Sequence, residues 1–281
     1  MNAIEIKGLT KGYSGFKLDD INLVLPSGSI MGLVGENGAG KSTTIKLIMD
    51  AISRDAGEIS VLGVDNRGAE FSVAKEDIGV VLDEAYFPEV MSAKNVAKVM
   101  KRTYKRWDDV CYKSYIERFS LPMDKAFKDF SRGMKMKLAI AVALSHNPKL
   151  LILDEATSGL DPMVRDEILD IFNDFTRDEG HSILLSSHIV SDLEKICDYI
   201  AFLHKGKMVL CEEKDRLLEE YAMVKLSEQE LNSLPEDGVI GTKRGEYGAE
   251  ALVLRSKVSP SFTLEHTSLE DIILFLAKGG R

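Results

Sequence analysis

A glycine-rich segment that ends in a lysine and two hydroxyl residues is the clearest place for chemistry in this sequence. The stretch GENGAGKST fits the pattern G-x-x-x-x-G-K-[ST] and stands between an apolar run and a helix-forming segment. Glycines there let consecutive backbone N–H groups point at phosphate oxygens, and the helix N-terminus adds its dipole. We expect phosphate or nucleotide contacts from Gly35, Asn37, Gly38, Ala39, Gly40, Lys41, Ser42 and Thr43. Lys41 would reach the β- and γ-phosphates, and Ser42 would offer its hydroxyl to Mg²⁺.

Two adjacent carboxylates, Asp154 and Glu155, follow the apolar run LLIL. Mg²⁺ prefers oxygen ligands and keeps several waters, so one protein carboxylate suffices, and Asp154 is the candidate. Because neighbouring residues of a strand point in opposite directions, we expect Glu155 to face the other way and to orient an attacking water. Ordinary strand-end charge facing solvent is the alternative, and the nearby phosphate loop favours the functional interpretation.

The segment DFSRGMKMKLAIAVAL predicts a helix whose start carries an unusual charge. Ser131 is a suitable helix cap, and Gly133 is small enough for a close backbone approach. Arg132, Lys135 and Lys137 nevertheless add positive charge where the helix dipole is already positive. We expect this helix start to await an anion; a capped surface helix with solvated lysines is the alternative.

The elements that must position these residues alternate between strands and helices. Strands are expected within residues 3–34 and at 56–65, 77–84, 149–156, 181–187 and 199–210, and helices at 41–52, 163–179, 189–197, 212–221 and 268–277. This alternation predicts an α/β fold with a mostly parallel sheet covered on both faces, and the opening strands predict an antiparallel flank. Residues 85–147 have a helical texture, whereas the pattern weakens after about residue 212.

The composition narrows the class of protein. The 281 residues are 44% hydrophobic, which is enough for one large domain or two smaller ones. A net charge of −9 argues against a nucleic-acid-coating surface, so we expect no nucleic-acid partner. Three widely separated cysteines predict reduced thiols in a cytoplasmic protein. No apolar run approaches the roughly 18 residues of a membrane helix, and no signal pattern is present, so any membrane role requires a partner.

Taken in order, the motifs resemble those of the ATP-binding subunit of an ABC transporter, over residues 3–211. GENGAGKST resembles Walker A, LLILDEATSGLD resembles Walker B running into a D-loop that ends at Asp161, and FSRGMK resembles the signature motif. His188 resembles the switch histidine that contacts the γ-phosphate, and Tyr13 resembles the aromatic that stacks on adenine. A polar residue at a strand end and half-buried packing are the alternatives for these two. The resemblance implies a P-loop NTPase core and a Mg²⁺-dependent ATPase that binds ATP.

The resemblance also implies partners. In this family two ATP-binding subunits face each other head to tail, and each ATP lies between the cradle of one and the signature helix of the other. Ser131 and Gly133 would then contact the γ-phosphate of a nucleotide bound to a second chain, and Asp161 would belong to the same nucleotide site. A homodimer attached to an integral membrane permease is implied, which places the chain on the cytoplasmic side as a peripheral protein of the cell membrane.

Two departures from the family pattern concern charge. Phe130, Arg132 and Met134 replace the first, third and fifth letters of the usual L-S-G-G-Q signature, while Ser131 remains. Asp83 stands where the family has a glutamine. We expect Asp83 to bind Mg²⁺ or to position water, and it adds a negative charge near the catalytic carboxylate.

The motif positions divide the chain. We expect an ATP-binding α/β core at 1–84 and 148–211, a helical signature subdomain at 85–147, and a C-terminal accessory segment at 212–281. The leading interpretation is the ATPase subunit of a drug, peptide or antibiotic exporter. A nucleotide-gated regulatory module with little hydrolysis is one alternative, and a soluble ABC ATPase of DNA repair or translation is another. Soluble ABC ATPases of repair or translation usually carry a long coiled-coil insert or zinc-binding cysteines, and this sequence shows neither pattern.

Overall fold

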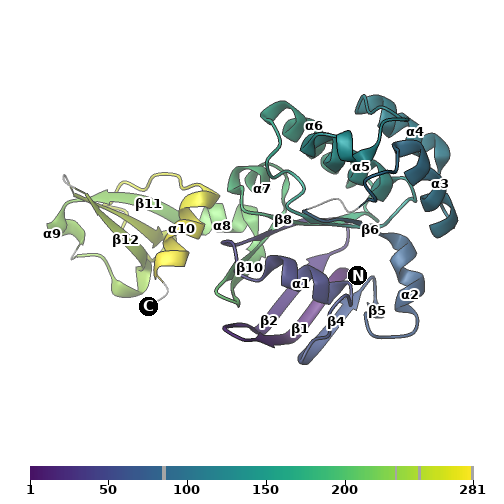
Figure 1. The fold of residues 1–281 in the computed structure, drawn as a ribbon. Coiled ribbons are helices and arrows are strands. Elements are labelled where there is room, and N and C mark those ends of the chain that lie inside the picture. Colours follow the sequence, from purple (N-terminus) through teal and green to yellow (C-terminus); the bar gives the residue numbers. More distant parts are fainter. Residues whose placement is uncertain (84–86, 232, 246–247, 280–281) are drawn as a thin grey trace.

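The computed structural model describes residues 1–83, 87–231, 233–245 and 248–279, and a six-stranded sheet lies at its centre (Figure 1). Its strand order is β10-β9-β3-β8-β7-β6, and all neighbours are parallel except β10, which runs antiparallel to β9. The strands are β3 (Ile30–Val34), β6 (Ile78–Val81), β7 (Leu150–Asp154), β8 (Ser182–Ser187), β9 (Tyr199–His204) and β10 (Lys207–Glu213). Every residue of β3, β7 and β8 is buried, as expected for parallel strands covered on both faces.

A second sheet is antiparallel and covers one face of the central sheet. Its order is β2-β1-β4-β5, and it is drawn in purple and blue at the lower right of Figure 1. Its strands are β1 (Asn2–Tyr13), β2 (Phe16–Pro26), β4 (Ala56–Val61) and β5 (Val64–Asp65). Helix α1 (Lys41–Ile48) packs between the two sheets, since its apolar side chains share one hydrophobic cluster with both.

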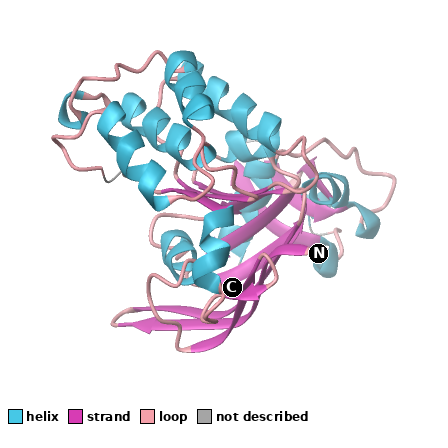
Figure 2. Cartoon of the chain, turned by 90° about the vertical axis from the view of Figure 1, so that its right-hand side faces the viewer, coloured by secondary structure: helices cyan, strands magenta, loops and turns pink. Residues whose placement is uncertain are grey.

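Helices cover the opposite face of the central sheet (Figure 2). The α-helices before residue 200 are, besides α1, α2 (Phe71–Ala74), α3 (Ala93–Thr103), α4 (Asp109–Arg118), α5 (Arg132–Leu144), α6 (Pro162–Phe175) and α7 (Val190–Ile196), with short 3₁₀ turns at Lys75–Asp77 and Phe127–Asp129. Strand pleating explains how one sheet serves two cores: Met31 and Leu33 of β3 enter the cluster with α1, whereas Ile30 and Val34 enter the cluster with the other helices.

The end of the chain forms a C-terminal module, defined here as residues 221–279, which lies to the left of the core in Figure 1. Its elements are β11 (Tyr221–Leu226), α9 (Glu228–Leu231), β12 (Val239–Gly245), β13 (Gly248–Leu254) and α10 (Leu269–Gly279), with 3₁₀ turns at Glu236–Gly238 and Arg255–Lys257, and α8 (Lys214–Glu220) leads into it. The three strands form an antiparallel sheet of order β11-β13-β12. Ala222 and Val224 of β11 pack on Ala251 and Val253 of β13 in a core of their own.

Helix α10 attaches this module to the core. The backbone N–H of Leu269 donates a hydrogen bond to Glu194 Oε2 at 3.2 Å. Leu269, Ile272 and Phe275 are buried in the same apolar cluster as Leu193 of α7. The α10 helix therefore packs against the helix that follows the predicted switch histidine.

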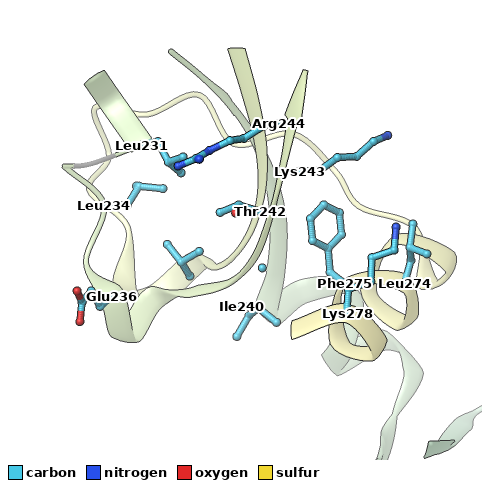
Figure 3. A pocket seen from close by; sticks show the side chains of 12 residues that line it. Leu231, Leu234, Glu236, Ile240, Thr242, Lys243, Arg244, Leu274, Phe275 and Lys278 are labelled. Atoms are coloured by element: carbon cyan, nitrogen blue, oxygen red, sulfur yellow. The ribbon is translucent and has the colours of Figure 1, made fainter. Parts of the chain in front are cut away.

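The C-terminal module encloses a hollow of about 550 Å³ between β12 and α10 (Figure 3). Its wall combines apolar side chains, among them Leu234, Ile240 and Phe275, with polar and charged ones. A Cβ at Gly241 would lie 3.0 Å from the Phe275 ring, so glycine lets α10 come close to the strand. Lys243, Arg244, Lys278 and Glu236 supply the charged side chains that line it.

The predicted fold class is confirmed: a mostly parallel sheet, an antiparallel flank and a helical layer are all present. The helix expected at 41–52 ends at Ile48, because Asp50 takes a left-handed φ of 51°. The helix expected at 212–221 starts at Lys214, because β10 extends to Glu213. Some predictions fall outside the described residues. These are Glu84 at the end of the strand expected at 77–84, the domain boundary between residues 84 and 85, residues 85–86 of the predicted helical subdomain, and residues 280–281. Within the described ranges, no helix is long and apolar enough to span a bilayer.

Candidate functional site

The glycine-rich loop connects the buried end of β3 to the first residue of α1. At Gly35 a Cβ would lie 2.4 Å from the carbonyl oxygen of Leu203, and at Gly40 it would lie 2.4 Å from the Leu18 side chain. Gly40 also has a φ of 114°, a conformation that residues with a Cβ rarely adopt. Both glycines are therefore required by the local packing as well as by the phosphate pattern.

Lys41 is the first residue of α1, and its side chain is buried. Its Nζ donates to the carbonyl oxygen of Gly35 at 2.8 Å and lies 3.4 Å from Glu155 Oε1. The glycine-rich loop thus folds around the ammonium group of Lys41 and holds it near the N-terminus of α1. Ser42 lies beside it and is exposed.

The two carboxylates after β7 have different surroundings. Asp154 is the last residue of β7 and is buried, and its Oδ1 accepts a hydrogen bond from Ser186 Oγ at 2.8 Å. Glu155 lies beyond the strand with a left-handed φ of 52°, and its N–H donates to the Ser186 carbonyl. Strand alternation therefore does not set the direction of Glu155, because a turn does.

That turn brings Glu155 to His188. His188 follows β8, and its Nδ1 lies 2.6 Å from Glu155 Oε2. Since Glu155 Oε1 faces Lys41, this carboxylate stands between a buried ammonium and a half-exposed imidazole. The three residues come from three separate segments of the chain, and the central sheet brings them together.

These residues line a cavity of about 570 Å³, the core cavity. Of the predicted residues, its wall contains Asn37, Gly38, Gly40, Lys41, Ser42, Thr43, Asp83, Glu155 and His188. Gly35, Ala39 and Asp154 are not part of that wall; Gly35 holds Lys41 through its carbonyl, and Ala39 and Asp154 are buried.

A second, smaller hollow of about 180 Å³ has three further predicted residues in its wall, Ser131, Gly133 and Asp161, and we call it the signature hollow. Ser131 caps α5 by accepting a hydrogen bond from the Met134 N–H at 3.2 Å, as predicted, and Gly133 follows two residues later, within the first turn. Asp161 caps α6 in the same way, through the Val164 N–H at 3.1 Å. The two helix starts lie together here, and Ser131, Gly133 and Asp161 do not line the core cavity.

The cations at the start of α5 find partners within the chain. Lys135 Nζ lies over the Phe127 ring, 4.9 Å from its centroid. Lys137 Nζ donates to Glu167 Oε2 of α6 at 2.8 Å. An anion from outside is therefore not needed to accommodate these two charges.

Arg132 is the residue at this site that the sequence analysis did not place. Its Nη2 donates to Asp83 Oδ1 at 3.2 Å, and both side chains belong to the wall of the core cavity. The two residues are 49 positions apart, so no local pattern indicated the pair.

Among the described residues, the cavity wall contains the aromatic ring of Phe16, whereas Tyr13 is not part of it. Tyr13 is 48% exposed, and Lys11 Nζ lies 5.5 Å from its ring centroid. The two aromatics pair across the tight β1–β2 turn. Spacing alone could have suggested Phe16, because it is the next aromatic after Tyr13 in the same hairpin.

The oxygen donors at this site suit a cation that takes most of its ligands from substrate phosphates and water. Ser42 and Asp154 are oxygen donors, and within the described ranges no cluster of three or more His, Cys, Asp or Glu residues could hold a metal. Mg²⁺ is typically bound by one or two protein oxygens, substrate phosphates and water, so these residues fit it.

The parallel sheet, the glycine-rich loop before α1 and the Lys41–Glu155–His188 cluster together define a P-loop nucleotide-binding protein. Residues 18–158 match the sequence pattern of the family described as ABC transporter. The ABC transporter ATP-binding protein YtrB of Bacillus subtilis (strain 168) is 30% identical over 225 residues, which cover 80% of this chain and 76% of YtrB.

Two further similarities agree. The lantibiotic transport ATP-binding protein SrtF of Streptococcus pyogenes is 36% identical over 216 residues, covering 75% of this chain and 91% of SrtF. A solved structure of the ATP-binding subunit of an ABC transporter has a TM-score of 0.69 and 28% identity, and the match covers 76% of this chain and 91% of that one. The chain belongs to the family of ABC transporter ATP-binding proteins, and it is an ATPase of this class.

Proposed function

We propose that this chain is the ATP-hydrolysing subunit of an exporter, in which two copies close over two ATP molecules and drive a separate membrane permease. The observation that carries the proposal is the division of the motif residues between two hollows. Lys41, Glu155 and His188 converge in the core cavity, whereas Ser131 and Gly133 belong to the signature hollow. A nucleotide in the core cavity would lack the signature contacts unless a second chain supplied them.

The contacts within the core cavity suggest how hydrolysis proceeds. Lys41 is shared between the Gly35 carbonyl and Glu155. The phosphates of ATP carry more negative charge than one carboxylate, so they would draw the ammonium away and leave Glu155 Oε1 for a water. Glu155 would then orient that water and accept its proton, while His188 holds the other carboxylate oxygen.

Mg²⁺ completes the proposed site. Because Arg132 engages Asp83, we assign the cation to Ser42 and Asp154 instead. When bound, the ion would neutralise phosphate charge. Asp154 is already oriented for this role by the hydroxyl of Ser186.

The rest of the assignment follows the family. We assign residues 1–84 and 148–211 to the ATP-binding core, 85–147 to a helical signature subdomain and 212–281 to an accessory segment. The subunit would work as a homodimer on the cytoplasmic face of the cell membrane, held there by its permease. The name of the lantibiotic transport relative supports a peptide antibiotic as the class of cargo.

A Glu155→Gln variant tests this function. Loss of the proton acceptor should lower ATP turnover by about 10³-fold while ATP binding persists. Light scattering should find a dimer that forms only with ATP, because the bridging phosphate is no longer removed. Glu179→Gln, an exposed glutamate far along the chain, serves as the matched control. Unchanged turnover, or ATP bound by a protein that stays monomeric at every concentration, would refute the proposal.

A further inference from the structure

Three consecutive residues at the start of α5 face two different hollows. Ser131 and Gly133 belong to the signature hollow, whereas Arg132 between them belongs to the core cavity. The signature segment is therefore not dedicated to a neighbouring chain. One of its side chains points at the nucleotide cavity of its own chain.

The guanidinium of Arg132 is placed by two contacts outside α5. Its Nη2 donates to Asp83 Oδ1 at 3.2 Å. It also lies against Gly159, where a Cβ would come within 2.7 Å of Nη1, and Gly159 has a left-handed φ of 68°. A glycine at this turn thus leaves the space that the guanidinium fills, and the arginine links α5, the Asp83 segment and the turn that leads to α6.

The charges of the cavity wall give this link a chemical consequence. In the described part of the chain, the wall contains two lysine or arginine side chains, Lys41 and Arg132, and three carboxylates, Glu36, Asp83 and Glu155. A triphosphate is repelled by each unpaired carboxylate and attracted by each cation. Without Arg132, Asp83 would present its full charge to the phosphates.

We propose that Arg132 is a positioning residue that acts within its own chain, where it neutralises Asp83 at the rim of the nucleotide cavity and holds the start of α5 against the Gly159 turn. The acid at position 83 and the arginine at position 132 then act as one unit, and Arg132 is needed for ATP binding only where an acid stands at position 83. This inference rests on the proposed assignment of the core cavity as the ATP site.

A double-mutant cycle tests the pair through binding alone. The wild type, Arg132→Ala, Asp83→Asn and the double variant are titrated with ATP by calorimetry in EDTA, so that no metal contributes. Arg132→Ala should weaken ATP binding about fivefold, whereas Asp83→Asn and the double variant should each lie within about twofold of the wild type, so the two single effects do not add. Both side chains are more than half exposed, so the four proteins are expected to fold alike, and their melting temperatures check this.

Two controls separate charge from structure. Arg132→Lys should restore most of the affinity, and the deficit of Arg132→Ala should shrink as salt is raised, because the effect is electrostatic. Lys135→Ala removes a cation that lies over Phe127 in the same helix, and it should leave ATP affinity unchanged.

The possible outcomes are distinct. If the effects of the single substitutions simply add, or if Lys135→Ala weakens binding as much as Arg132→Ala, Arg132 has no specific role and the inference is wrong. Lys41→Ala identifies the source of a failure. Normal ATP binding by Lys41→Ala would remove the core cavity as the ATP site, whereas lost binding together with additive effects would overturn only the Arg132 assignment.

Discussion

The core and the C-terminal module each contain a hollow of similar volume, about 570 and 550 Å³, but the side chains that line the two hollows differ. The core cavity is lined by a glycine-rich loop and by charged groups such as Lys41 and Glu155. The hollow of the module has large apolar side chains in its wall, such as Leu234, Ile240 and Phe275, beside charged ones such as Glu236 and Lys243. Volume therefore says little about function, whereas convergent polar groups on separate elements indicate chemistry.

The two regions are nevertheless in contact. The Leu269 N–H at the start of α10 donates to Glu194, which belongs to α7, and α7 follows His188. A change in the module can thus reach the catalytic region through one helix. Single substitutions in the two regions can measure how far ATP turnover and ATP binding in the core depend on this contact.

The largest expected effect comes from the lysine of the core cavity. Lys41→Ala should lower ATP turnover by about 10³-fold, because the phosphates lose their buried cation. Steady-state phosphate release measures this. Lys278→Ala removes a lysine from the wall of the other hollow and should leave turnover unchanged. A comparable loss in both variants would end the distinction between the two regions.

An intermediate effect is expected from truncating Phe275, the α10 side chain that is buried in the apolar cluster. Phe275→Ala should destabilise the module by about 3 kcal/mol, since it leaves a cavity in the apolar cluster. Urea unfolding gives the change in free energy, and ATP affinity should stay within about twofold of the wild type. Leu274→Ala, on the same helix but 42% exposed, should cost less than about 0.5 kcal/mol. A parallel loss of ATP affinity in Phe275→Ala would make the module part of the catalytic unit.

The smallest effect should come from the contact itself. Glu194→Ala removes the acceptor for Leu269 and a negative charge from the start of α10, at a cost of about 1 kcal/mol. Hydrogen exchange of the first-turn amides of α10 should accelerate accordingly, while those of β3 do not change. Glu219→Ala on α8 is the matched exposed control. Unaltered exchange in α10 would mean that apolar packing alone holds the module to the core.

Local pattern predicted the strands, the loop and the helix around the core cavity well, because the cues for these elements are local. A buried strand followed by glycines, Lys41 and a helix admits few conformations, and the carboxylates after β7 belong to the same kind of edge. The direction of Glu155 was not predictable from pleating, because a left-handed turn sets it. The Arg132–Asp83 pair depends on how the helical layer packs on the sheet, which spacing does not encode.

The module was less readable for a different reason. Segment 237–254 contains several glycines, which interrupt the alternation typical of a strand, so the sequence pattern predicts no strand there. It contains the β12 and β13 strands, and Gly241 within it lets Phe275 approach. Glycines thus obscure the strand pattern in the sequence, and one of them, Gly241, makes room for the packing of α10.

The alternating orientation of Ser131 and Arg132 has a genetic consequence for mixed dimers. In the proposed dimer, Ser131 serves the nucleotide of the neighbouring chain and Arg132 serves its own. A chain with Ser131→Ala paired with a chain with Arg132→Ala therefore concentrates both defects on a single nucleotide and spares the other. A chain that carries both substitutions, paired with an intact chain, spoils both nucleotides. Alleles of adjacent codons would complement each other in trans and fail in cis.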